Sequence, residues 1–441
     1  MTFMETALLK LFRKSKTMTL STTGVKTWTT KAYYAMDHGF LFLIEKGGLT
    51  LKNINENPEV SFAIDENKLK VFAQGSGRVE ILGEPDNFDH ERGILLHKVP
   101  EDAMFAHHGH VFIARLIPTE IRAMDMRTEM KRFNEEINLD QMTEKIHPIL
   151  RSFRMWSFQQ SVITLLIGSI LAERLNLMFL ALSAFGIMAA HGSFNVISGY
   201  FDFRTGNDNV RSLTSSRVFV DRLVAQKLIL AVSFIILGLA LTDGVYLALS
   251  VPAIWPFIAI GIVAGALYSA PKIGFKKYAL GDIAVFVAWS PGIFLGSYVL
   301  QGGIISLPIL LISFSVALLT VNVLHGNNWR DIDDDRKVGV RTVANLLGEE
   351  GSKFYYYSLM WVPYILVIAA YFLSNSLYPL FAVMLTVPLA IQLTRIAWNR
   401  KNIKRGILDM LTARATFYFG LFGAISYLAF TYAAGMLHLV Y

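Results

Sequence analysis

Residues 327–348, NNWRDIDDDRKVGVRTVANLLG, follow closely on an apolar run at 304–324. That run is long enough for a membrane-crossing helix, which needs about twenty apolar residues. If the helix continues, Asn327, Asp331 and Asp335 repeat every four residues and share one face. Carboxylates one turn apart repel each other, and a bound divalent cation removes that repulsion. The stretch therefore predicts a metal site where a membrane helix ends.

A second acidic cluster lies upstream, at the end of another apolar run. Asn195, Ser198 and Asp202 follow i, i+3, i+7 spacing, and Asp208 comes from the loop beyond. Mg²⁺ is usually held by one or two carboxylates together with substrate phosphate oxygens. Two such clusters facing each other would bind a diphosphate through Mg²⁺. A charge run alone usually marks a solvated loop, but two Asn/Asp clusters at the ends of two spans favour the metal site.

Composition divides the chain into a soluble part and a membrane part. Hydrophobic residues make up 53% of the chain and charged residues only 17%, which is too apolar for an ordinary soluble protein. Charges are spread evenly up to about residue 132, and long apolar stretches begin at about residue 155. We expect nine transmembrane helices, near 155–173, 176–197, 224–241, 246–268, 281–301, 304–324, 355–373, 377–394 and 415–436.

Basic residues set the expected orientation of these spans. They gather in the connections 198–223, 269–280, 325–354 and 395–414, whereas Arg174 is nearly the only one in the opposite connections. The positive-inside rule then places the N-terminal domain and both acidic clusters in the cytoplasm and the C-terminus outside the plasma membrane. The first residues also lack the apolar core of a cleaved export signal.

Two further features of the composition narrow the function. The chain has no cysteine, which excludes disulfides, Cys-ligated zinc, iron–sulfur clusters and thiol nucleophiles. Its net charge is +7, but most of the basic excess lies beside apolar stretches. We therefore expect contact with the lipid bilayer and no binding of nucleic acid.

The acidic clusters and their flanks resemble the UbiA superfamily of intramembrane aromatic prenyltransferases. Residues 327–348 look like the second Asp-rich motif of the branch that prenylates dihydroxynaphthoate in menaquinone synthesis. Residues 268–283, YSAPKIGFKKYALGDI, are similar to that branch's loop after the fourth helix. Residues 210–219, VRSLTSSRVF, resemble the basic stretch after the first motif. The resemblance implies an all-α transmembrane bundle of nine helices over 154–441.

The first motif departs from the family pattern. Ser198 and Gly199 stand where the family usually has Asn, often Asn-Asp. The departure removes one metal or phosphate ligand, which Asn195 one turn earlier could replace. Asp202 and Asp208 remain in register with the family's paired carboxylates.

The resemblance implies Mg²⁺-dependent transfer of a polyprenyl group from its diphosphate to an aromatic acceptor. The implied catalytic and metal-binding residues are Asp202, Asp208, Asp331 and Asp335, with Asn195, Asn327 and Asn328 as further metal ligands. The implied diphosphate-binding residues are Arg204, Arg211, Arg217, Lys276, Lys337 and Arg341. Aromatic residues expected beside the acceptor or a developing carbocation are Tyr200, Tyr268, Trp289 and Trp329.

Several alternatives stay open at this point. The same chemistry could act on a phenazine, a hydroxybenzoate, a chlorin or a glycerol phosphate lipid. A membrane-anchored flavin oxidoreductase would use the bundle only to dock a quinone, but it would not need paired Asp motifs on two helices. A transporter would bind ions through its Asp residues, but it would keep them near mid-membrane.

Residues 1–130 predict a small antiparallel β domain. Short runs such as VSFAI and HVFIARL alternate apolar and polar residues between turns. Their order resembles the split-barrel flavoproteins related to pyridoxamine phosphate oxidase, which implies FMN, another flavin or heme as cofactor and a homodimer formed through this domain. The flavin contacts that the resemblance implies are Lys52, Asn53, Thr19, Ser21 and Gln74.

Two stretches of the front part are expected to be accessory. His97, His107, His108 and His110 are expected to be solvated loop residues rather than metal or heme ligands. Residues 131–153 mix charged and apolar side chains. They predict a linker that ends in an amphipathic helix at the membrane surface.

Overall fold

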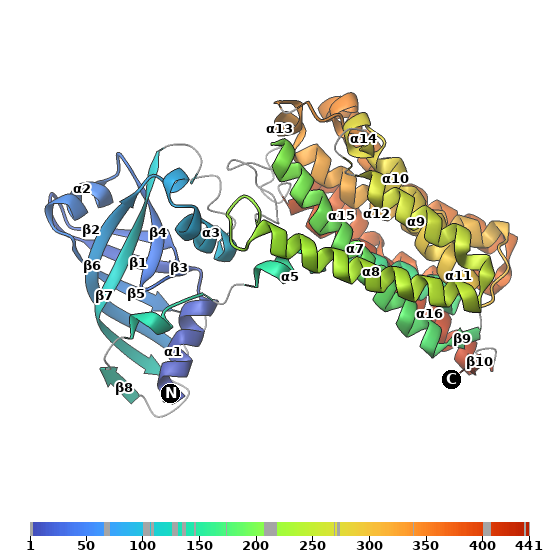
Figure 1. Ribbon diagram of the computed structural model, residues 1–441, viewed down its shortest axis with the longest axis horizontal. Helices are drawn as coiled ribbons and strands as arrows, with labels where there is room; N and C mark the ends of the chain where they lie inside the picture. Colours follow the sequence, from blue (N-terminus) through green and yellow to red (C-terminus); the bar gives the residue numbers. More distant parts are fainter. Residues whose placement is uncertain are drawn as a thin grey trace. The chain divides into compact units, whose positions relative to one another are not determined.

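The computed structural model describes residues 3–65, 71–99, 106, 110–125, 131–134, 138–144, 147–172, 174–206, 218–268, 270, 274–337, 339–399, 407–435 and 438–440. By their contacts the residues form two compact units, whose elements are labelled in Figure 1. The front unit is Met1–Arg151 together with Asp208–Gln226. The membrane unit is Ser152–Asn207 together with Lys227–Tyr441.

An antiparallel sheet forms a half-barrel in the front unit, as the strand pattern predicts. The sheet has eight strands in the order β2-β1-β5-β6-β7-β4-β3, with β8 paired to β7. In β5 the alternation buries Val60, Phe62 and Ile64 and exposes the residues between them. The strands are β1 Thr17–Thr22, β2 Trp28–Tyr33, β3 Ala35–Met36, β4 Phe40–Glu45, β5 Glu59–Asp65, β6 Val71–Gly83, β7 Val111–Asp125 and β8 Lys131–Asn134.

Helices and aromatic side chains complete the core of the front unit. The Phe40 ring lies edge-on to Phe12, at 5.1 Å between centroids, and to Tyr34, at 5.2 Å. The Tyr34 hydroxyl donates to the Phe12 carbonyl at 2.9 Å, which fixes the end of α1 against the sheet. The helices are α1 Phe3–Lys14, α2 Leu49–Glu56, α3 Asp89–Lys98 and α5 Pro148–Ser152, which ends at the first residue of the membrane unit, with short turns η1 Pro85–Asn87 and η3 Leu139–Gln141.

Two glycines in β6 are required by close strand packing. A Cβ on Gly75 would meet the carbonyl oxygen of Glu120, and one on Gly77 would meet that of Ile117. The register between β6 and β7 shifts at this place, between Ser76 and Gly77. The Gly-X-Gly stretch is therefore a site of close backbone approach within the sheet.

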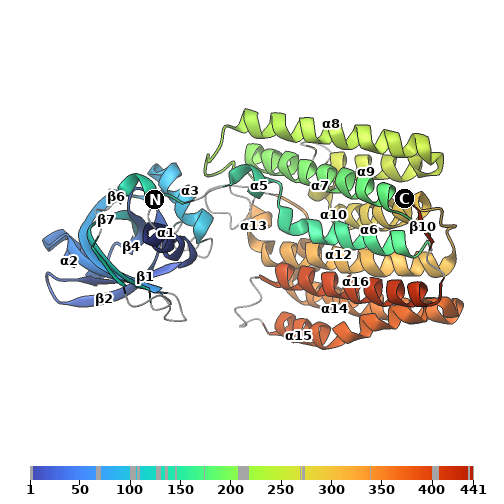
Figure 2. The ribbon, with the colours of Figure 1, turned by 90° about the horizontal axis from the view of Figure 1, so that it is seen from below.

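Helices build the membrane unit and run side by side (Figure 2). Helix α12 packs against α10, α14 and α16. Helix α14 changes direction at Gly348, whose φ is 65°. The helices are α6 Phe158–Ile170, α7 Leu177–Thr205, α8 Gln226–Ser250, α9 Trp255–Tyr268, α10 Gly281–Val287, α11 Gly296–Leu300, α12 Leu307–Arg330, α13 Ile332–Lys337, α14 Val343–Leu373, α15 Val387–Trp398 and α16 Leu408–Ala433.

Shorter elements extend or join these helices. The 3₁₀-helical segments are η4 Met155–Ser157, η5 Pro252–Ile254, η6 Phe275–Tyr278 and η8 Asn375–Thr386, and the π-helical segment is η7 Ala288–Leu295. The π-helical segment η7 contains Pro291 and joins α10 to α11. Strands β9 Arg174–Asn176 and β10 His438–Val440 pair in parallel.

Seven helical segments in the described part of the chain are long and apolar enough to cross a membrane. The nine-helix prediction is therefore not confirmed in number, although each predicted span overlaps a helix. Two of the nine overlap shorter segments, because α6 has 13 residues and the apolar helix Pro252–Tyr268 falls below the length of a full span. The predicted span at 355–373 starts twelve residues earlier, as α14 begins at Val343.

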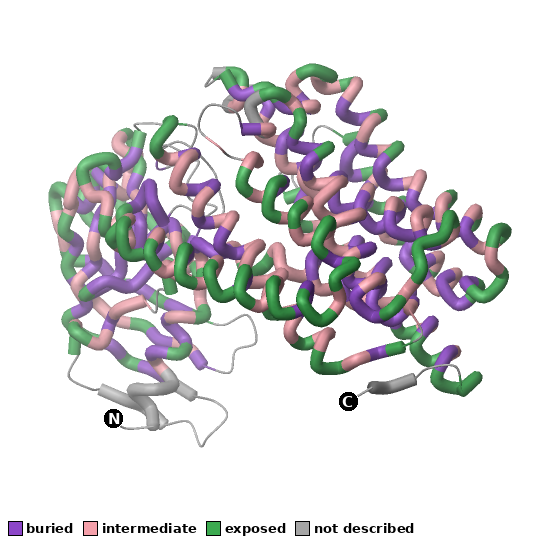
Figure 3. Tube along the Cα trace, turned by 45° about the vertical axis from the view of Figure 1, so that its right-hand side comes forward, coloured by how far each residue is buried: buried purple, intermediate pink, exposed green. Residues whose placement is uncertain are grey.

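Large apolar side chains on the outside of the bundle agree with a lipid environment. Leu249, Phe372 and Ile304 are 71%, 77% and 86% exposed in a chain described without lipid. Figure 3 shows such exposed positions along the outer helices, with buried ones between them. Patches of this kind on a soluble surface would be aggregation sites, so membrane insertion accounts for them.

Buried hydroxyl groups connect helices inside the bundle. Ser290 in η7 and Ser313 in α12 lie 2.7 Å apart, and Tyr356 in α14 and Thr412 in α16 are also 2.7 Å apart. Small hydroxyl side chains are a common means of joining membrane helices, because an unsatisfied polar group in hydrocarbon is unfavourable.

Candidate active site

Arg330 is the centre of the second acidic cluster. It ends α12, and its Nε and Nη2 donate to both carboxylate oxygens of the neighbouring Asp331 at 2.8 and 2.9 Å. Nη2 also donates to Asn327 Oδ1 at 2.7 Å. Its third nitrogen, Nη1, donates to Oδ2 of Asp409 at 3.0 Å. One guanidinium thus fixes three oxygen-bearing side chains, and bidentate pairing of this kind fixes geometry as well as charge.

Asp409 comes from α16, far along the sequence, and no local pattern predicts its role. Its carboxylate is buried, at 5% exposure. Gly326 in α12 allows α16 to come this close, since a Cβ there would lie 3.3 Å from the Asp409 nitrogen. The only signal in the sequence is a single carboxylate at the start of an apolar run.

The turn after α13 joins two predicted diphosphate-binding segments. The nitrogen of Ala279 donates to the carbonyl of Arg341 at 2.8 Å. Ala279 ends the turn η6, in which Lys276 lies, so this bond brings the 275–280 loop to the loop that follows the second motif. The Arg341 side chain is exposed. The side chains of Lys276 and Lys337 lie outside the described residues.

Asp335 and Asn328 extend the second cluster. The Asp335 nitrogen donates to the Asp331 carbonyl at 2.9 Å, which continues the helical turn beyond Arg330. Asp335 is half-buried, and Asn328 is buried within α12. The helical face predicted to carry Asn327, Asp331 and Asp335 therefore runs from the last turn of α12 into the first turn of α13.

The first acidic cluster lies on one continuous helix, as its spacing predicts. Helix α7 extends to Thr205, so Asn195, Ser198 and Asp202 belong to it. Asp202 is buried, and the Ser198 hydroxyl donates to its Oδ2 at 3.5 Å. The helix ends at Gly206, whose φ of 79° suits glycine. Arg204 is exposed. Asp208, Arg211 and Arg217 lie outside the described residues.

Asn195 has a structural role through its amide nitrogen. Nδ2 donates to the Phe153 carbonyl at 3.1 Å and to the Ser157 hydroxyl at 3.3 Å. It therefore ties α7 to the segment that leads into α6. If Asn195 replaces the missing metal ligand of the first motif, it would bind the metal through its amide oxygen, Oδ1.

A buried carboxylate and aromatic side chains from three helices are linked next to the second motif. The Asp282 carboxylate in α10 accepts a hydrogen bond from the Tyr355 hydroxyl in α14. The His325 ring lies edge-on to Tyr355 at 4.8 Å and stacks near Trp329 at 6.1 Å. His325 Nε2 is 3.1 Å from the Ser352 carbonyl, so this nitrogen carries the proton.

The predicted aromatic residues have different neighbours in the described structure. Trp329 is buried, and its indole nitrogen donates to Glu349 at 3.0 Å. Trp289 lies edge-on to His191 at 5.4 Å. Tyr200 lies 5.7 Å from Phe201 on the same helix. Tyr268 ends α9 and is half-buried.

The two acidic clusters lie at the same end of the membrane unit. The C-terminal end of α7 and the junction of α12 with α13 reach this end in both ribbon views (Figures 1 and 2). Among the described residues, no group of three or more His, Asp or Glu side chains lies close enough to hold a metal ion. The oxygen donors of Asp202, Asp331 and Asn327 nevertheless suit Mg²⁺ in kind.

The predicted flavin contacts of the front unit differ in their surroundings. Asn53 is fully buried, and Nδ2 donates to Thr22 Oγ1 at 2.9 Å and to the Lys26 carbonyl at 2.6 Å. Its Oδ1 accepts from the Lys26 nitrogen at 3.2 Å, so the amide closes a loop of the domain itself. Ser21 Oγ lies 3.1 Å from Thr29 Oγ1. The remaining predicted contacts are exposed; they are Lys52, Thr19 and Gln74.

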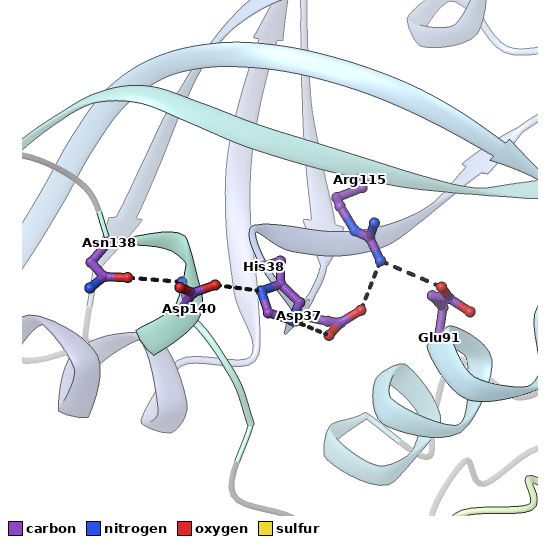
Figure 4. A network of polar contacts seen from close by, with 6 residues as sticks. All are labelled: Asp37, His38, Glu91, Arg115, Asn138 and Asp140. Carbon is purple, nitrogen blue, oxygen red and sulfur yellow. Dashed lines mark hydrogen bonds and ion pairs between the residues drawn. The ribbon is translucent and has the colours of Figure 1, made fainter.

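A polar network links elements of the front unit that are distant in sequence. Arg115 in β7 donates to Asp37 at 2.8 Å and to Glu91 at 3.5 Å (Figure 4). His38 then links Asp37, at 4.0 Å, to Asp140, at 3.6 Å. These partners pair with one another, so the network stabilises the fold and offers no open ligand set among the labelled residues.

The prediction of a solvated loop is wrong for His97. It lies in the last turn of α3 and is half-buried, and its carbonyl accepts from Arg151 Nη1 at 3.0 Å. Burial, together with the positive charges of Arg151 and His147, lowers the pKa of His97 to about 4. His110 is exposed as expected. His107 and His108 lie outside the described residues.

Lys98, next in the chain, is held in an ion pair. Its ammonium lies 2.8 Å from Glu144 and 4.0 Å from the centre of the Tyr34 ring. Burial lowers the pKa of Lys98, although Glu144 opposes the shift. Burial also raises the pKa of the Tyr34 phenol.

The membrane part of the chain is similar in sequence to known proteins. The model of the UbiA prenyltransferase family matches residues 161–410. A UbiA prenyltransferase domain-containing protein 1 homolog from Drosophila melanogaster is 30% identical over 289 residues, which is 63% of this chain and 78% of that protein. The human UbiA prenyltransferase domain-containing protein 1 is 29% identical over 288 residues, which is 63% of this chain and 82% of that protein.

Solved structures match each half of the chain at low identity. A UbiA homolog from Archaeoglobus fulgidus bound to GPP and Mg²⁺ covers 64% of this chain and all of its own, at 16% identity and a TM-score of 0.48. A heme binding protein from Mycobacterium smegmatis covers 31% of this chain and 59% of its own, at 16% identity and a TM-score of 0.26.

Proposed function

The chain belongs to the UbiA prenyltransferase family and is a prenyltransferase, and we propose that it uses Mg²⁺ to transfer a polyprenyl group from its diphosphate to an aromatic acceptor. The observation that carries this proposal is the position of the acidic clusters. Asp202 and Asp331 lie on different helices whose ends reach the same end of the bundle. Two helix ends that bear oxygen ligands are what a metal-bound diphosphate requires.

The metal would be held by the acidic residues of the two motifs. Bound there, Mg²⁺ supplies Lewis-acid stabilisation of the charge that develops on the diphosphate oxygens. The carboxylates that would hold it are Asp202, Asp208, Asp331 and Asp335, with Asn195, Asn327 and Asn328 as further ligands. Arg330 fixes the direction in which the Asp331 carboxylate points and adds positive charge where the diphosphate would lie.

The chain's other residues would bind the substrate and protect the reaction. Cleavage of the allylic C–O bond leaves its electron pair on the diphosphate, an electron-rich ring carbon of the acceptor forms the new C–C bond, and the ring then loses its proton. Apolar helices exclude water from the carbocation, which would otherwise be hydrolysed. The basic residues proposed to neutralise the diphosphate are Arg204, Arg211, Arg217, Lys276, Lys337 and Arg341.

The acceptor is proposed to be of the dihydroxynaphthoate type, in lipoquinone synthesis. The support is the resemblance of residues 327–348 and 268–283 to that branch of the family. Aromatic residues proposed beside the acceptor or the cation are Tyr200, Tyr268 and Trp289. A phenazine, a hydroxybenzoate, a chlorin or a glycerol phosphate lipid are the alternatives that the assay below separates.

The membrane arrangement and the front unit complete the proposal. We place nine spans in the plasma membrane with the front unit and the acidic clusters in the cytoplasm, supported by the distribution of basic residues. The front unit is proposed to be a split barrel that forms a homodimer. Its binding of FMN, another flavin or heme stays a prediction, which an absorbance spectrum of the purified protein tests directly.

A substrate panel tests the function. Purified full-length protein is assayed with polyprenyl diphosphates of several lengths and with each acceptor class, with Mg²⁺ and with EDTA. Release of inorganic diphosphate and formation of a prenylated product are both measured. The proposal predicts a Mg²⁺-dependent product with a dihydroxynaphthoate, and it is wrong if product forms equally in EDTA or with none of the aromatic acceptors.

A further inference from the structure

Asp282 is a buried carboxylate of the membrane unit that keeps one oxygen without a partner. It lies in the first turn of α10 and is 4% exposed. The carboxylate accepts a hydrogen bond from the Tyr355 hydroxyl of α14, whereas Oδ2 has no hydrogen-bond partner among the described residues. Native proteins leave few buried polar atoms unsatisfied. An ionisable group in this state inside a membrane bundle indicates that a ligand supplies the missing donor.

The neighbours of this carboxylate place it beside the second acidic motif. Tyr355 lies edge-on to His325 at 4.8 Å, and His325 precedes Asp331 by six residues on α12, about 9 Å along the helix axis. The turn before α10 reaches the same region, because the Ala279 nitrogen donates to the Arg341 carbonyl at 2.8 Å. An acceptor ring must come within about 3–3.5 Å of the allylic carbon that leaves the diphosphate. Its substituents therefore fall in this range of depth.

Trp289 offers a complementary group on the same helical face. It follows Asp282 by seven residues, so the two side chains lie on one face. Its buried Nε1 is a donor that has no hydrogen-bond partner in the part of the chain that the structure describes. Between them on this face, Phe286 packs against Phe314 of α12 at 5.2 Å, and the Trp289 ring lies edge-on to His191 of α7 at 5.4 Å. The face of α10 and η7 thus contacts both helices that carry the acidic motifs.

We propose that this face binds the aromatic acceptor through two oxygens. Asp282 Oδ2 takes the proton of a ring hydroxyl, and Trp289 Nε1 donates to a second oxygen of the same molecule. The two unpartnered groups define the chemical class of the ligand, because one needs a donor and the other an acceptor. An aromatic ring with one hydroxyl and a second hydroxyl or a carboxylate satisfies both. Tyr355 is a positioning residue, since its hydroxyl holds the carboxylate of Asp282.

The proton transfer raises the reactivity of the ring at the moment it is needed. As the new C–C bond forms, the O–H bond of the acceptor breaks, its electron pair enters the ring, and the proton passes to Asp282 Oδ2. The substituted ring carbon then loses its hydrogen as a proton to the released diphosphate. Asp282 returns its own proton to the acceptor oxygen, which restores the aromatic hydroxyl. A positioned base of this kind contributes about 10²–10⁴ in rate.

This inference rests on the proposed function, since it requires an aromatic acceptor. It also separates a base from a structural hydrogen bond between α10 and α14. Loss of a base lowers turnover in proportion to how firmly the acceptor holds its hydroxyl proton, and it leaves diphosphate binding unchanged. A contact that only stabilised the fold would affect every acceptor equally.

Four substitutions in the full-length protein test the two contacts. Asp282→Asn keeps the size of the side chain and removes the base, and Asp282→Glu retains a carboxylate. Tyr355→Phe removes the hydroxyl that holds Asp282. Trp289→Phe keeps an aromatic ring and removes the donor. The matched controls are Asp243→Asn and Tyr246→Phe, both on α8.

Two measurements separate the acceptor from the diphosphate. Steady-state kinetics use 1,4-dihydroxy-2-naphthoate and a series of naphthols whose hydroxyl groups differ in acidity. Binding of a prenyl S-thiolodiphosphate, a stable analogue of the other substrate, is measured in the presence of Mg²⁺. Thermal unfolding of each variant is recorded alongside.

The expected losses fall on the acceptor alone. Asp282→Asn should lower kcat/KM for the acceptor about a hundredfold, and the loss should shrink as the hydroxyl becomes more acidic, because an ionised hydroxyl needs no base. Asp282→Glu should recover part of the rate, and Tyr355→Phe should lose about tenfold. Trp289→Phe should raise the acceptor KM about tenfold, the effect of one hydrogen bond. All variants should bind the analogue within about twofold of wild type, and the controls should match wild type throughout.

The outcomes that overturn the proposal differ from those that overturn the function. If wild type prenylates the naphthoate and Asp282→Asn does so equally well, Asp282 is not the base, while the proposed function stands. An equal loss for every naphthol, or a loss of analogue binding, also excludes the base role. If wild type forms no prenylated aromatic product, the proposed function fails together with this inference. Should Asp282→Asn unfold, acceptor kinetics of Tyr355→Phe and Trp289→Phe decide, and unchanged values in both refute the acceptor site.

Discussion

Arg330 Nη1, at the end of α12, donates to Oδ2 of Asp409, near the start of α16, across 3.0 Å. The same guanidinium holds both oxygens of Asp331. Asp409 therefore fixes the carboxylate of Asp331, a proposed metal ligand, indirectly through the arginine between them. The pair also joins two helices at the proposed diphosphate site, so packing and chemistry depend on one group.

Replacing Asp409 with Asn should impair catalysis without abolishing it. Arg330 keeps Asp331 and Asn327 as partners but loses its charged anchor on α16, so the Asp331 carboxylate is held less firmly. We expect kcat/KM for the diphosphate to fall about tenfold, equivalent to roughly 1.4 kcal/mol. Steady-state assays of diphosphate release measure this. Asp243→Asn, a carboxylate change on α8 outside both motifs, is the control and should retain full activity.

Replacing Arg330 itself should mainly destabilise the protein. Arg330→Met leaves the buried Asp409 carboxylate without its cation, and removing one partner of a buried ion pair costs about 3–5 kcal/mol. Thermal unfolding in detergent should show the loss. An unchanged unfolding temperature in Arg330→Met would mean that the guanidinium contributes little to the junction of α12 with α16.

Asp331→Asn should abolish diphosphate release and leave the fold intact. The amide keeps the size of the side chain and one oxygen but cannot supply the negative charge that a divalent cation needs. Turnover with saturating substrate and the thermal unfolding temperature are measured together. Full turnover in a folded Asp331→Asn protein contradicts the metal-binding role of this residue.

Removal of Mg²⁺ should stop the reaction reversibly. EDTA should abolish product formation and added Mg²⁺ should restore it, because the metal stabilises the charge on the leaving diphosphate. Mg²⁺ with the thiolodiphosphate analogue should also raise the unfolding temperature of wild type, since a ligand that binds only the folded state stabilises it. Asp331→Asn should lose that increase, and an equal increase in both proteins would place the metal elsewhere.

The helices that carry the proposed site could be predicted because their signals are local. Helical periodicity places Asn195, Ser198 and Asp202 on α7, and the structure extends that helix to Thr205. The acidic run after α12 continues as α13 for the same reason. Backbone hydrogen bonding decides both cases, and it acts between residues only four apart.

The remaining contacts depend on tertiary packing, which no local pattern records. Arg330 and Asp409 are 79 positions apart, and only the approach of α16 at Gly326 brings them together. Asn53 has the residue type of a phosphate contact, but its neighbours in space are Thr22 and Lys26, which accept from both of its amide hydrogens and donate to its amide oxygen. Residue type fixes which bonds a side chain can make, and the fold selects the partner.

His97 should make the front unit sensitive to mild acid. Its pKa is about 4 in the folded protein and about 6.5 in an unfolded chain. Between these values the unfolded chain binds a proton that the folded one does not, so stability falls as the pH drops from about 6.5 to 4. His97→Gln should remove this part of the dependence, and His110→Gln, at an exposed histidine of the same unit, should not. Unfolding by denaturant is followed at pH 4.5 and 7. Hydrogen exchange of β6 peptides, pulse-labelled at one fixed pH, reports the unfolding of the front unit separately from that of the membrane unit. Identical pH dependence in wild type and His97→Gln would show that this imidazole takes up its proton over the same pH range in the folded protein and in the unfolded chain.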